Sequence, residues 1–98
     1  MATFSELINQ DKLVLVDFYA TWCGPCKTLA PMLQEVKNEL KEALALIPID
    51  VDKNQAVAAK FQVRSVPTMI AFKDGKQVWK QSGVVPANQL VQTLKQLM

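Results

Sequence analysis

Histidine is absent from the 98 residues of this chain. Without an imidazole, Ser-His-Asp and Cys-His catalytic sites and histidine-containing zinc sites are excluded, so any proton transfer must use a carboxyl, amine, phenol, thiol or water. No apolar run reaches the roughly 18 residues that a transmembrane helix needs, so no membrane partner is expected. The net charge of +2 is too small to indicate a nucleic-acid partner.

Cysteine and glycine are also scarce, with two and three residues respectively. Two cysteines cannot build the disulfide framework of a small secreted protein, and inside a cell a close pair indicates redox catalysis or a metal site. Segment 1–6 has neither the basic nor the apolar stretch of a signal peptide, so a cytoplasmic location is expected. The length is close to the usual domain size, and we expect one domain over residues 1–98 that acts as a monomer.

Hydrophobic periodicity and turn residues predict eight elements in the order α-β-α-β-α-β-β-α. Helices are expected over residues 4–10, from 23 to about 40–42, over 55–61 and over 87–97, and strands over 12–20, 44–50, 68–73 and 77–82. The helix between the first two strands predicts a right-handed parallel crossover, and Asp74-Gly75 between the last two predicts an antiparallel hairpin. The fold class is therefore α/β, with a mixed sheet that carries helices on both faces.

Pro48 lies inside the strand predicted over 44–50. A proline has no N–H to donate to a neighbouring strand, so within a sheet it is tolerated at an edge and disfavoured in a central strand. We therefore place the 44–50 strand at an edge of the sheet.

The two cysteines, Cys23 and Cys26, stand where the apolar run gives way to the long helix. A thiol at a helix N-terminus faces unpaired N–H groups and the positive end of the helix dipole, and both stabilise its reactive thiolate. The two thiols are one helical turn apart and can close a small disulfide, while Pro25 between them is compatible with the first turn. We assign Cys23, as the more exposed thiol at the helix end, to nucleophilic attack, and Cys26 to resolution of the mixed disulfide.

Two other interpretations of the cysteine pair are less favoured. Buried free cysteines often serve as small hydrophobic core residues. A Cys-x-x-Cys segment can also supply half of a zinc site, but zinc needs two more ligands, and the chain has no histidine and no other cysteine to complete the usual set. Redox chemistry is therefore the preferred interpretation, and no metal is expected.

Asp17 interrupts the apolar run 13–20. A surface-facing position near the end of the strand would account for it, but its alternation with Val16 and Phe18 favours burial below the cysteines. Burial without a nearby cation disfavours the ionised carboxylate, so its pKa is expected to rise. A protonatable carboxyl beneath Cys26 could relay a proton through water while that thiol attacks, and we assign Asp17 to the catalytic set on this ground.

Four segments of the chain form a recognisable set. They are Val16–Lys27, which contains Cys-Gly-Pro-Cys, then Arg64–Thr68, Phe72–Gly75 and Gly83. In this order and spacing they resemble the active site, the cis-proline loop, the hairpin and a site glycine of the thioredoxin family, and the similarity covers nearly the whole chain. The resemblance implies the thioredoxin fold, disulfide-containing protein substrates and regeneration by a thioredoxin reductase. No bound cofactor is expected, because the chain has no Gly-x-Gly-x-x-Gly loop for a dinucleotide.

The chain departs from the family pattern at two places. It begins at the helix that contains Phe4, so the N-terminal edge strand common in bacterial thioredoxins is expected to be missing, which leaves four strands. Many thioredoxins also carry a lysine on the second strand near the buried aspartate, and the aligned residue here is Pro48. Whether another cation partners Asp17 is left open by the sequence.

The resemblance also implies a substrate-binding surface around the cysteines. A cis Val66–Pro67 bond would place the Val66 backbone beside the disulfide, where it could pair with an extended substrate strand. Gly83 and Val84 would form the opposite lip, since glycine permits close backbone approach. Trp22 could be a core residue, but its place beside the first cysteine favours substrate contact. The predicted substrate-binding set is Trp22, Gly24, Pro25, Val66, Pro67, Gly83 and Val84.

The expected function is that of a protein dithiol–disulfide oxidoreductase, which reduces disulfides in other proteins through Cys23 and Cys26. One alternative is an oxidant or isomerase of the same fold, but such proteins usually carry a histidine between their cysteines, and this chain has Gly24-Pro25 there. The other alternative is a non-catalytic binding subunit, whose activity would survive Cys→Ser changes.

Overall fold

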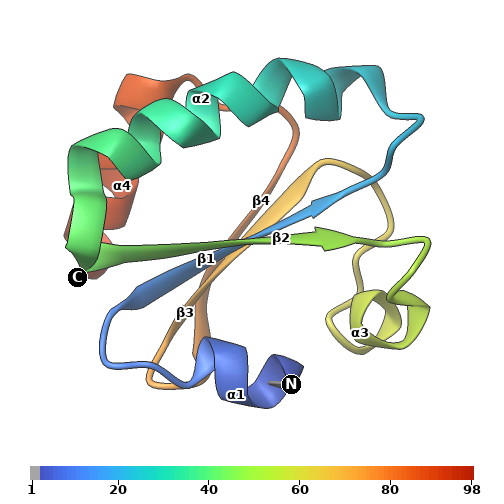
Figure 1. Ribbon diagram of the computed structural model, residues 1–98, viewed down its shortest axis with the longest axis horizontal. Coiled ribbons are helices and arrows are strands. Elements are labelled where there is room, and N and C mark those ends of the chain that lie inside the picture. Colours follow the sequence, from blue (N-terminus) through green and yellow to red (C-terminus); the bar gives the residue numbers. More distant parts are fainter. Residues whose placement is uncertain (1–2) are drawn as a thin grey trace.

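The computed structural model describes residues 3–98, and Figure 1 shows how its helices and strands are arranged. In chain order the elements are α1 (Phe4–Ile8), β1 (Leu13–Tyr19), α2 (Gly24–Leu40), the 3-10 turn η1 (Lys41–Ala43), β2 (Leu44–Asp50), α3 (Gln55–Lys60), β3 (Thr68–Lys73), β4 (Lys76–Ser82) and α4 (Ala87–Leu97). The predicted order of helices and strands is confirmed, and their ends agree with the prediction to within two residues. The largest difference is in the first helix, predicted over 4–10, which ends at Ile8 because Asn9 leaves the helical conformation.

The strands of the described segment form one mixed sheet in the order β2-β1-β3-β4. β1 runs parallel to β2 and antiparallel to β3, and β3 and β4 form an antiparallel hairpin. β2 therefore lies at an edge, as its proline predicted. In the parallel pair, Asp17 stands directly opposite Pro48.

Helices cover both faces of the sheet, with α2 and α4 on one side and α1 and α3 on the other (Figure 1). Each face buries its own apolar cluster. The cluster under α2 and α4 contains Leu13, Leu15, Leu29, Leu33, Val36, Leu40, Leu44, Met69, Ala71, Val85, Leu90, Val91 and Leu94, and the opposite cluster contains Ile8, Val14, Val16, Phe18, Ile70 and Phe72. None of the helices within residues 3–98 is long and apolar enough to cross a membrane.

The position of β1 between these clusters explains why its sequence is apolar throughout. Alternate side chains of a strand point to opposite faces of the sheet. Leu13 and Leu15 enter the cluster under α2, while Val14 and Val16 enter the other. Asp17 follows Leu15 by two positions, so its carboxyl lies on the face that α2 covers. The strand thus places a charged side chain beneath the helix that begins at the cysteines.

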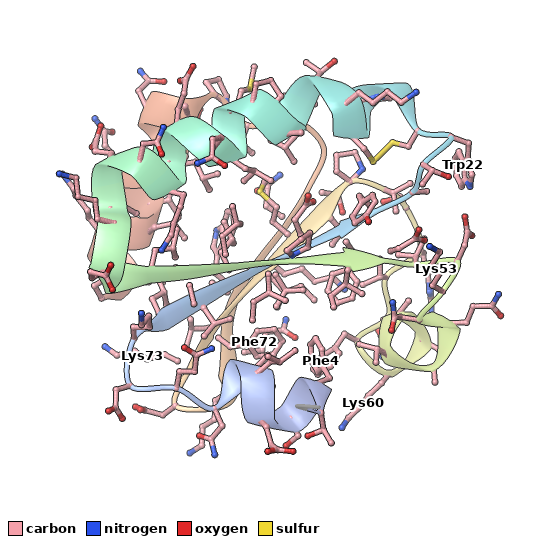
Figure 2. The ribbon with its side chains drawn as sticks, viewed as in Figure 1. Phe4, Trp22, Lys53, Lys60, Phe72 and Lys73 are labelled. Atoms are coloured by element: carbon pink, nitrogen blue, oxygen red, sulfur yellow. A yellow bond between two sulfur atoms is a disulfide. The ribbon has the colours of Figure 1, made fainter. Side chains whose placement is uncertain are left out.

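A cluster of phenylalanine rings fixes α1 to the sheet. A helix of five residues is too short to be stable by itself. The ring of Phe4 has its centroid 6.5 Å from Phe18, 5.4 Å from Phe61 and 5.9 Å from Phe72. Figure 2 shows Phe4 and Phe72 on the opposite side of the sheet from the disulfide. The phenylalanine cluster that holds α1 therefore lies on the face of the sheet away from the cysteines.

The hairpin between β3 and β4 has the predicted turn. Lys73 pairs with Lys76, which leaves Asp74 and Gly75 as its two central residues. Their φ angles are 53° and 79°, as a type I′ turn requires. The Asp-Gly prediction is confirmed.

Candidate functional site

The two cysteines lie at the N-terminus of α2, as predicted. Cys23 is the residue that caps the helix, and its Sγ accepts a hydrogen bond of 3.1 Å from the N–H of Cys26. Pro25 lies in the first turn, where its missing N–H costs no helical hydrogen bond. The two sulfur atoms form a disulfide, seen as the yellow bond in Figure 2, and the two Cα atoms are 5.3 Å apart. When the pair is reduced, the N–H groups at the helix start favour a thiolate at Cys23.

The prediction that Cys23 is the more exposed cysteine is wrong. In the disulfide form Cys23 is 4 % exposed and Cys26 is 6 % exposed, so exposure does not distinguish them. The two cysteines form a small apolar cluster with Ala20, against which Tyr19, Val51 and Val66 pack. What separates the two cysteines is their position: Cys23 precedes the first helical turn, while Cys26 lies within α2 and lines a cleft that also contains Asp17.

The loop before β3 stands against Cys23. The Val66–Pro67 peptide bond is cis, and the carbonyl oxygen of Val66 lies 3.6 Å from Cys23 Sγ. The N–H of Gly83 donates to the Pro67 carbonyl at 2.9 Å, which joins the end of β4 to this loop. Gly83 has a φ of 89°, a conformation that favours glycine, and Val84 after it is exposed. The structure thus places Val66 against the disulfide and joins Gly83 to the same loop through Pro67.

Trp22 is 70 % exposed, which excludes the core alternative. Its Nε1 donates a hydrogen bond of 2.8 Å to Oδ2 of Asp52, and the N–H of Asp52 donates to Oδ1 of Asp50 at 2.9 Å. Asp52 could not be predicted as the partner of Trp22, because no local sequence pattern links residues 30 positions apart. Gly24 and Pro25 are exposed next to Trp22, so this side of the disulfide carries an accessible rim.

Asp17 is buried, with 8 % of its surface exposed. Its Oδ1 has no hydrogen-bond partner, and none of the ion pairs between the described residues includes it. Burial raises the pKa of this carboxyl from 3.8 to about 6, because the charged form is poorly solvated there. The surface-facing alternative is therefore excluded, and among residues 3–98 no ion pair with Asp17 takes the place of the lysine in the family pattern, whose aligned position here is Pro48.

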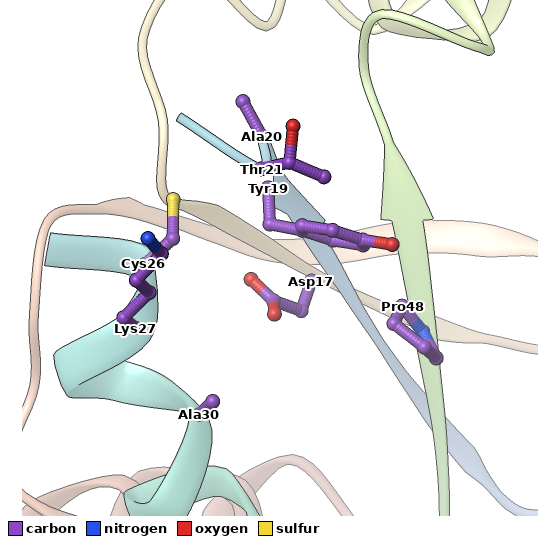
Figure 3. A pocket seen from close by; sticks show the side chains of 8 residues that line it. All are labelled: Asp17, Tyr19, Ala20, Thr21, Cys26, Lys27, Ala30 and Pro48. Atoms are coloured by element: carbon purple, nitrogen blue, oxygen red, sulfur yellow. The ribbon is translucent and has the colours of Figure 1, made fainter. Parts of the chain in front are cut away.

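A cleft of about 370 Å³ lies beside Asp17. Figure 3 shows the carboxyl pointing into the space between α2, which carries Cys26 and Ala30, and β2, which carries Pro48. A second cleft of about 350 Å³ extends along α2 and shares Asp17, Ala30 and Pro48 with the first. The carboxyl and the second cysteine therefore line one solvent-connected space.

Metal ligation is the other chemistry that a Cys-x-x-Cys segment supports. Within the part of the chain that the structure describes, no three His, Cys, Asp or Glu side chains gather in a group that could hold a metal ion. The cysteine pair thus lacks the further ligands of a zinc site.

A disulfide at the start of a helix, beside a cis-proline loop and at the end of a mixed β2-β1-β3-β4 sheet, defines a protein of the thioredoxin fold. The thioredoxin family model matches residues 1–96. The chain belongs to the thioredoxin family.

Three relatives show how far the similarity extends. The chloroplastic thioredoxin Y2 of Arabidopsis thaliana is 49 % identical over 94 residues, which are 95 % of this chain and 56 % of the relative. A thioredoxin-like protein of Synechocystis is 45 % identical over 95 residues, 96 % of this chain and 90 % of the relative. The bifunctional thioredoxin reductase/thioredoxin of Mycobacterium leprae is 49 % identical over 75 residues, 76 % of this chain and 16 % of the relative. The chain therefore spans little more than half the length of the chloroplastic relative and nearly all of the cyanobacterial one.

Proposed function

We propose that this chain is a protein dithiol–disulfide oxidoreductase that reduces disulfide bonds in other proteins. The observation that carries the proposal is the Cys23–Cys26 pair at the start of α2, where the N–H of Cys26 meets Cys23 Sγ at 3.1 Å. Once the disulfide is reduced, this contact and the helix dipole stabilise a thiolate at this position, which makes Cys23 the nucleophile. Membership of the thioredoxin family over residues 1–96 supports the proposal, and one domain carries the activity.

The reaction consists of two thiol–disulfide exchanges. In the first, the Cys23 thiolate attacks one sulfur of the substrate disulfide, so that the substrate S–S bond breaks and its other sulfur leaves as a thiolate and takes a proton. In the second, Cys26 loses its proton and attacks Cys23 Sγ. The mixed disulfide breaks, the second substrate sulfur leaves, and the Cys23–Cys26 disulfide forms. Two electrons pass from the dithiol to the substrate.

Asp17 accepts the proton that Cys26 releases. Both residues line the same cleft, which has room for water between them. A carboxyl with a pKa of about 6 is mostly ionised at neutral pH and is a stronger base than an ordinary aspartate. Burial thus suits it to proton transfer in the second exchange.

The substrate binds as an extended segment across the rim of the disulfide. The carbonyl oxygen of Val66 lies 3.6 Å from Cys23 Sγ. The Val66 backbone pairs with the substrate segment as a neighbouring strand does. Trp22 offers an exposed apolar surface on one side, together with Gly24 and Pro25. Pro67, Gly83 and the exposed Val84 form the other side.

A thioredoxin reductase restores the dithiol after each turnover. The name of the Mycobacterium leprae relative, which joins a reductase and a thioredoxin in one protein, supports this partner. We propose that the chain acts as a monomer in the cytoplasm, where thiols are kept reduced. The chloroplast is the other compartment to test, because the Arabidopsis relative is named as chloroplastic.

Reduction of insulin by dithiothreitol tests this function. The wild-type protein is expected to accelerate it, Cys23→Ser to abolish the acceleration, and Cys26→Ser to accumulate a covalent adduct through Cys23 that mass spectrometry detects. Ser5→Ala, at an exposed position of α1 on the other side of the sheet, is the control for a change of one small side chain away from the disulfide. If Cys23→Ser accumulated the adduct and Cys26→Ser did not, Cys26 would be the nucleophile and Cys23 the resolving thiol. Activity that survives both cysteine changes would show a binding subunit instead.

A further inference from the structure

We propose that the cleft between α2 and β2 binds a small primary amine, whose ammonium group meets the Asp17 carboxylate and whose apolar body lies against the cleft walls. This site goes beyond the disulfide chemistry and does not depend on it. It is a binding site for a class of small molecule, located beneath the cysteines on the face of the sheet that α2 covers (Figure 3).

The size and lining of the cleft suit a small ligand. Its volume of about 370 Å³ falls at the low end of small-molecule sites, which range from roughly 300 to 1,000 Å³. Tyr19, Ala20, Ala30 and Pro48 supply apolar walls. The second cleft continues from Ala30 and Pro48 toward Leu33 and Leu46, which extends the apolar surface for the ligand body.

A buried carboxyl is aimed into the space between these apolar walls (Figure 3). Asp17 is 8 % exposed, and its Oδ1 is buried and has no hydrogen-bond partner. A buried carboxylate oxygen without a hydrogen bond is costly, and a donor that reaches it recovers that cost. An ammonium supplies up to three donors and a full positive charge, so it is favoured over a neutral alcohol. An anion would be repelled, and one carboxylate is too few ligands for a metal ion.

None of the ion pairs between the described residues involves the Asp17 carboxylate. Lys27 and Lys37 are the lysines that line the two clefts. Lys37 Nζ donates to the carbonyl oxygen of Lys41 at 2.8 Å, so it is engaged near the end of α2, and Lys27 is exposed at the mouth. Pro48, the residue opposite Asp17, has no charged group to offer. Repulsion between the ligand and the exposed Lys27 is weak, because solvent and salt screen surface charges.

Titration of the oxidised protein followed by ¹H–¹⁵N NMR tests the site. With the disulfide closed, free thiols play no part. The probes are 2-phenylethylammonium and 2-phenylethanol, which share an apolar body and differ in charge. At a pH well above the pKa of Asp17 we expect saturable shifts at the amides of Ala20, Lys27 and Ala30, with a Kd for the amine on the order of 1 mM. The alcohol should bind about tenfold more weakly.

Three variants, one of them a surface control, test the role of Asp17 in amine binding. Asp17→Asn is expected to lose the preference for the amine, and the matched surface change Glu35→Gln to keep it. Pro48→Lys, which carries its own ammonium into the cleft, should also abolish amine binding while the fold is retained. Absence of saturable shifts at these amides, equal binding of amine and alcohol, or a preference that persists in Asp17→Asn would each overturn the proposal.

Discussion

Asp17 and Pro48 face each other across the parallel strands β1 and β2, and both line the cleft beneath the cysteines. Asp17 needs a donor or a cation there, and Pro48 supplies neither. The carboxyl is therefore buried without compensation, and its pKa rises to about 6. The result is a group that changes charge a little below neutral pH, in the same cleft as Cys26.

Replacing Asp17 with Asn should change how stability depends on pH. The pKa is 3.8 in an ordinary environment and about 6 in the fold, so the unfolded chain gives up this proton at lower pH than the folded chain does. Wild-type stability therefore falls as the pH rises through this window, by about 3 kcal/mol for a shift of this size. The stability of Asp17→Asn relative to wild type should rise by that amount over the window and stay constant above it. Denaturant melts at a series of pH values measure the difference.

The pH dependence of the stability difference between Asp17→Asn and wild type is more informative than its size at any one pH. A buried Asn amide that lacks partners carries its own cost, roughly 1–3 kcal/mol, which is the same at every pH. Asp74→Asn removes a carboxyl from an exposed turn and controls for the loss of one negative charge. A difference that stays flat with pH in Asp17→Asn would mean that Asp17 is solvated in the fold, and a difference that falls with rising pH would mean that it is paired with a cation.

Introducing a cation opposite Asp17 should lower its pKa again. Pro48→Lys places an ammonium on the strand that faces the carboxyl, and an opposite charge at close range depresses the pKa of an acid by about 1–3 units. Titration of the Asp17 side-chain carbon by ¹³C NMR measures this directly, with Pro48→Ala as the control that removes the ring without adding charge. Equal pKa values in Pro48→Lys and Pro48→Ala would show that a side chain at position 48 does not reach the carboxyl.

Local patterns were sufficient to predict the elements and the place of the cysteines. Asp74-Gly75 predicted the hairpin because few residues adopt two consecutive positive φ angles. Pro48 predicted an edge strand because a missing N–H is tolerated there. Cys23 and Cys26 were placed at a helix start because the strand pattern ends just before them, and the structure confirms this.

What the sequence could not predict depends on residues far apart in the chain. The hydrogen bond between Trp22 and Asp52 joins positions 30 apart, and no periodicity encodes it. The burial of Cys23 depends on Val66, which is 43 positions away and packs against it only when the loop before β3 folds back. Exposure of a site residue is a tertiary property, whereas its place on a helix is a local one.

Asp17→Asn should also slow the second exchange of the reaction. The Cys26 thiol loses its proton acceptor, and removal of a general base typically costs about 10²-fold or more in rate. Single-turnover release of substrate from the mixed disulfide measures this step. For wild type the rate should fall as the pH drops through about 6, because protonated Asp17 no longer accepts a proton. Alkylation of Cys23 by iodoacetamide reports the first thiol alone and should change little. If Asp17→Asn slowed the release of substrate and the alkylation of Cys23 equally, Asp17 would act on Cys23 and not on Cys26.

Loss of the Asp52 carboxylate should weaken substrate binding more than it affects folding. Asp52→Ala frees the Trp22 indole, which is 70 % exposed and otherwise held by one hydrogen bond of 2.8 Å. Because the pair is exposed, the free energy of unfolding should change by less than about 1 kcal/mol. The KM for a protein disulfide should rise a few-fold at nearly constant kcat. Asp52→Asn keeps an acceptor oxygen and should stay close to wild type. A fall in kcat at unchanged KM in Asp52→Ala would argue against a positioning role for this bond.

Truncation of Phe72 should destabilise the fold without altering the chemistry of the disulfide. Phe72 is fully buried on the face of the sheet away from α2, with its ring 5.2 Å from Phe61 and 5.9 Å from Phe4. Removal of a buried ring leaves a cavity and costs about 3–5 kcal/mol, which Phe72→Ala should show in urea melts. Phe72→Leu, a smaller change, keeps a folded population for kinetics if Phe72→Ala unfolds. Val78→Ala, at a site 41 % exposed on β4, should cost no more than about 0.5 kcal/mol.

In folded Phe72→Leu the rate of Cys23 alkylation should match wild type, since the rings and the disulfide occupy opposite sides of the sheet (Figure 2). A changed alkylation rate would show that the two faces are coupled through β1.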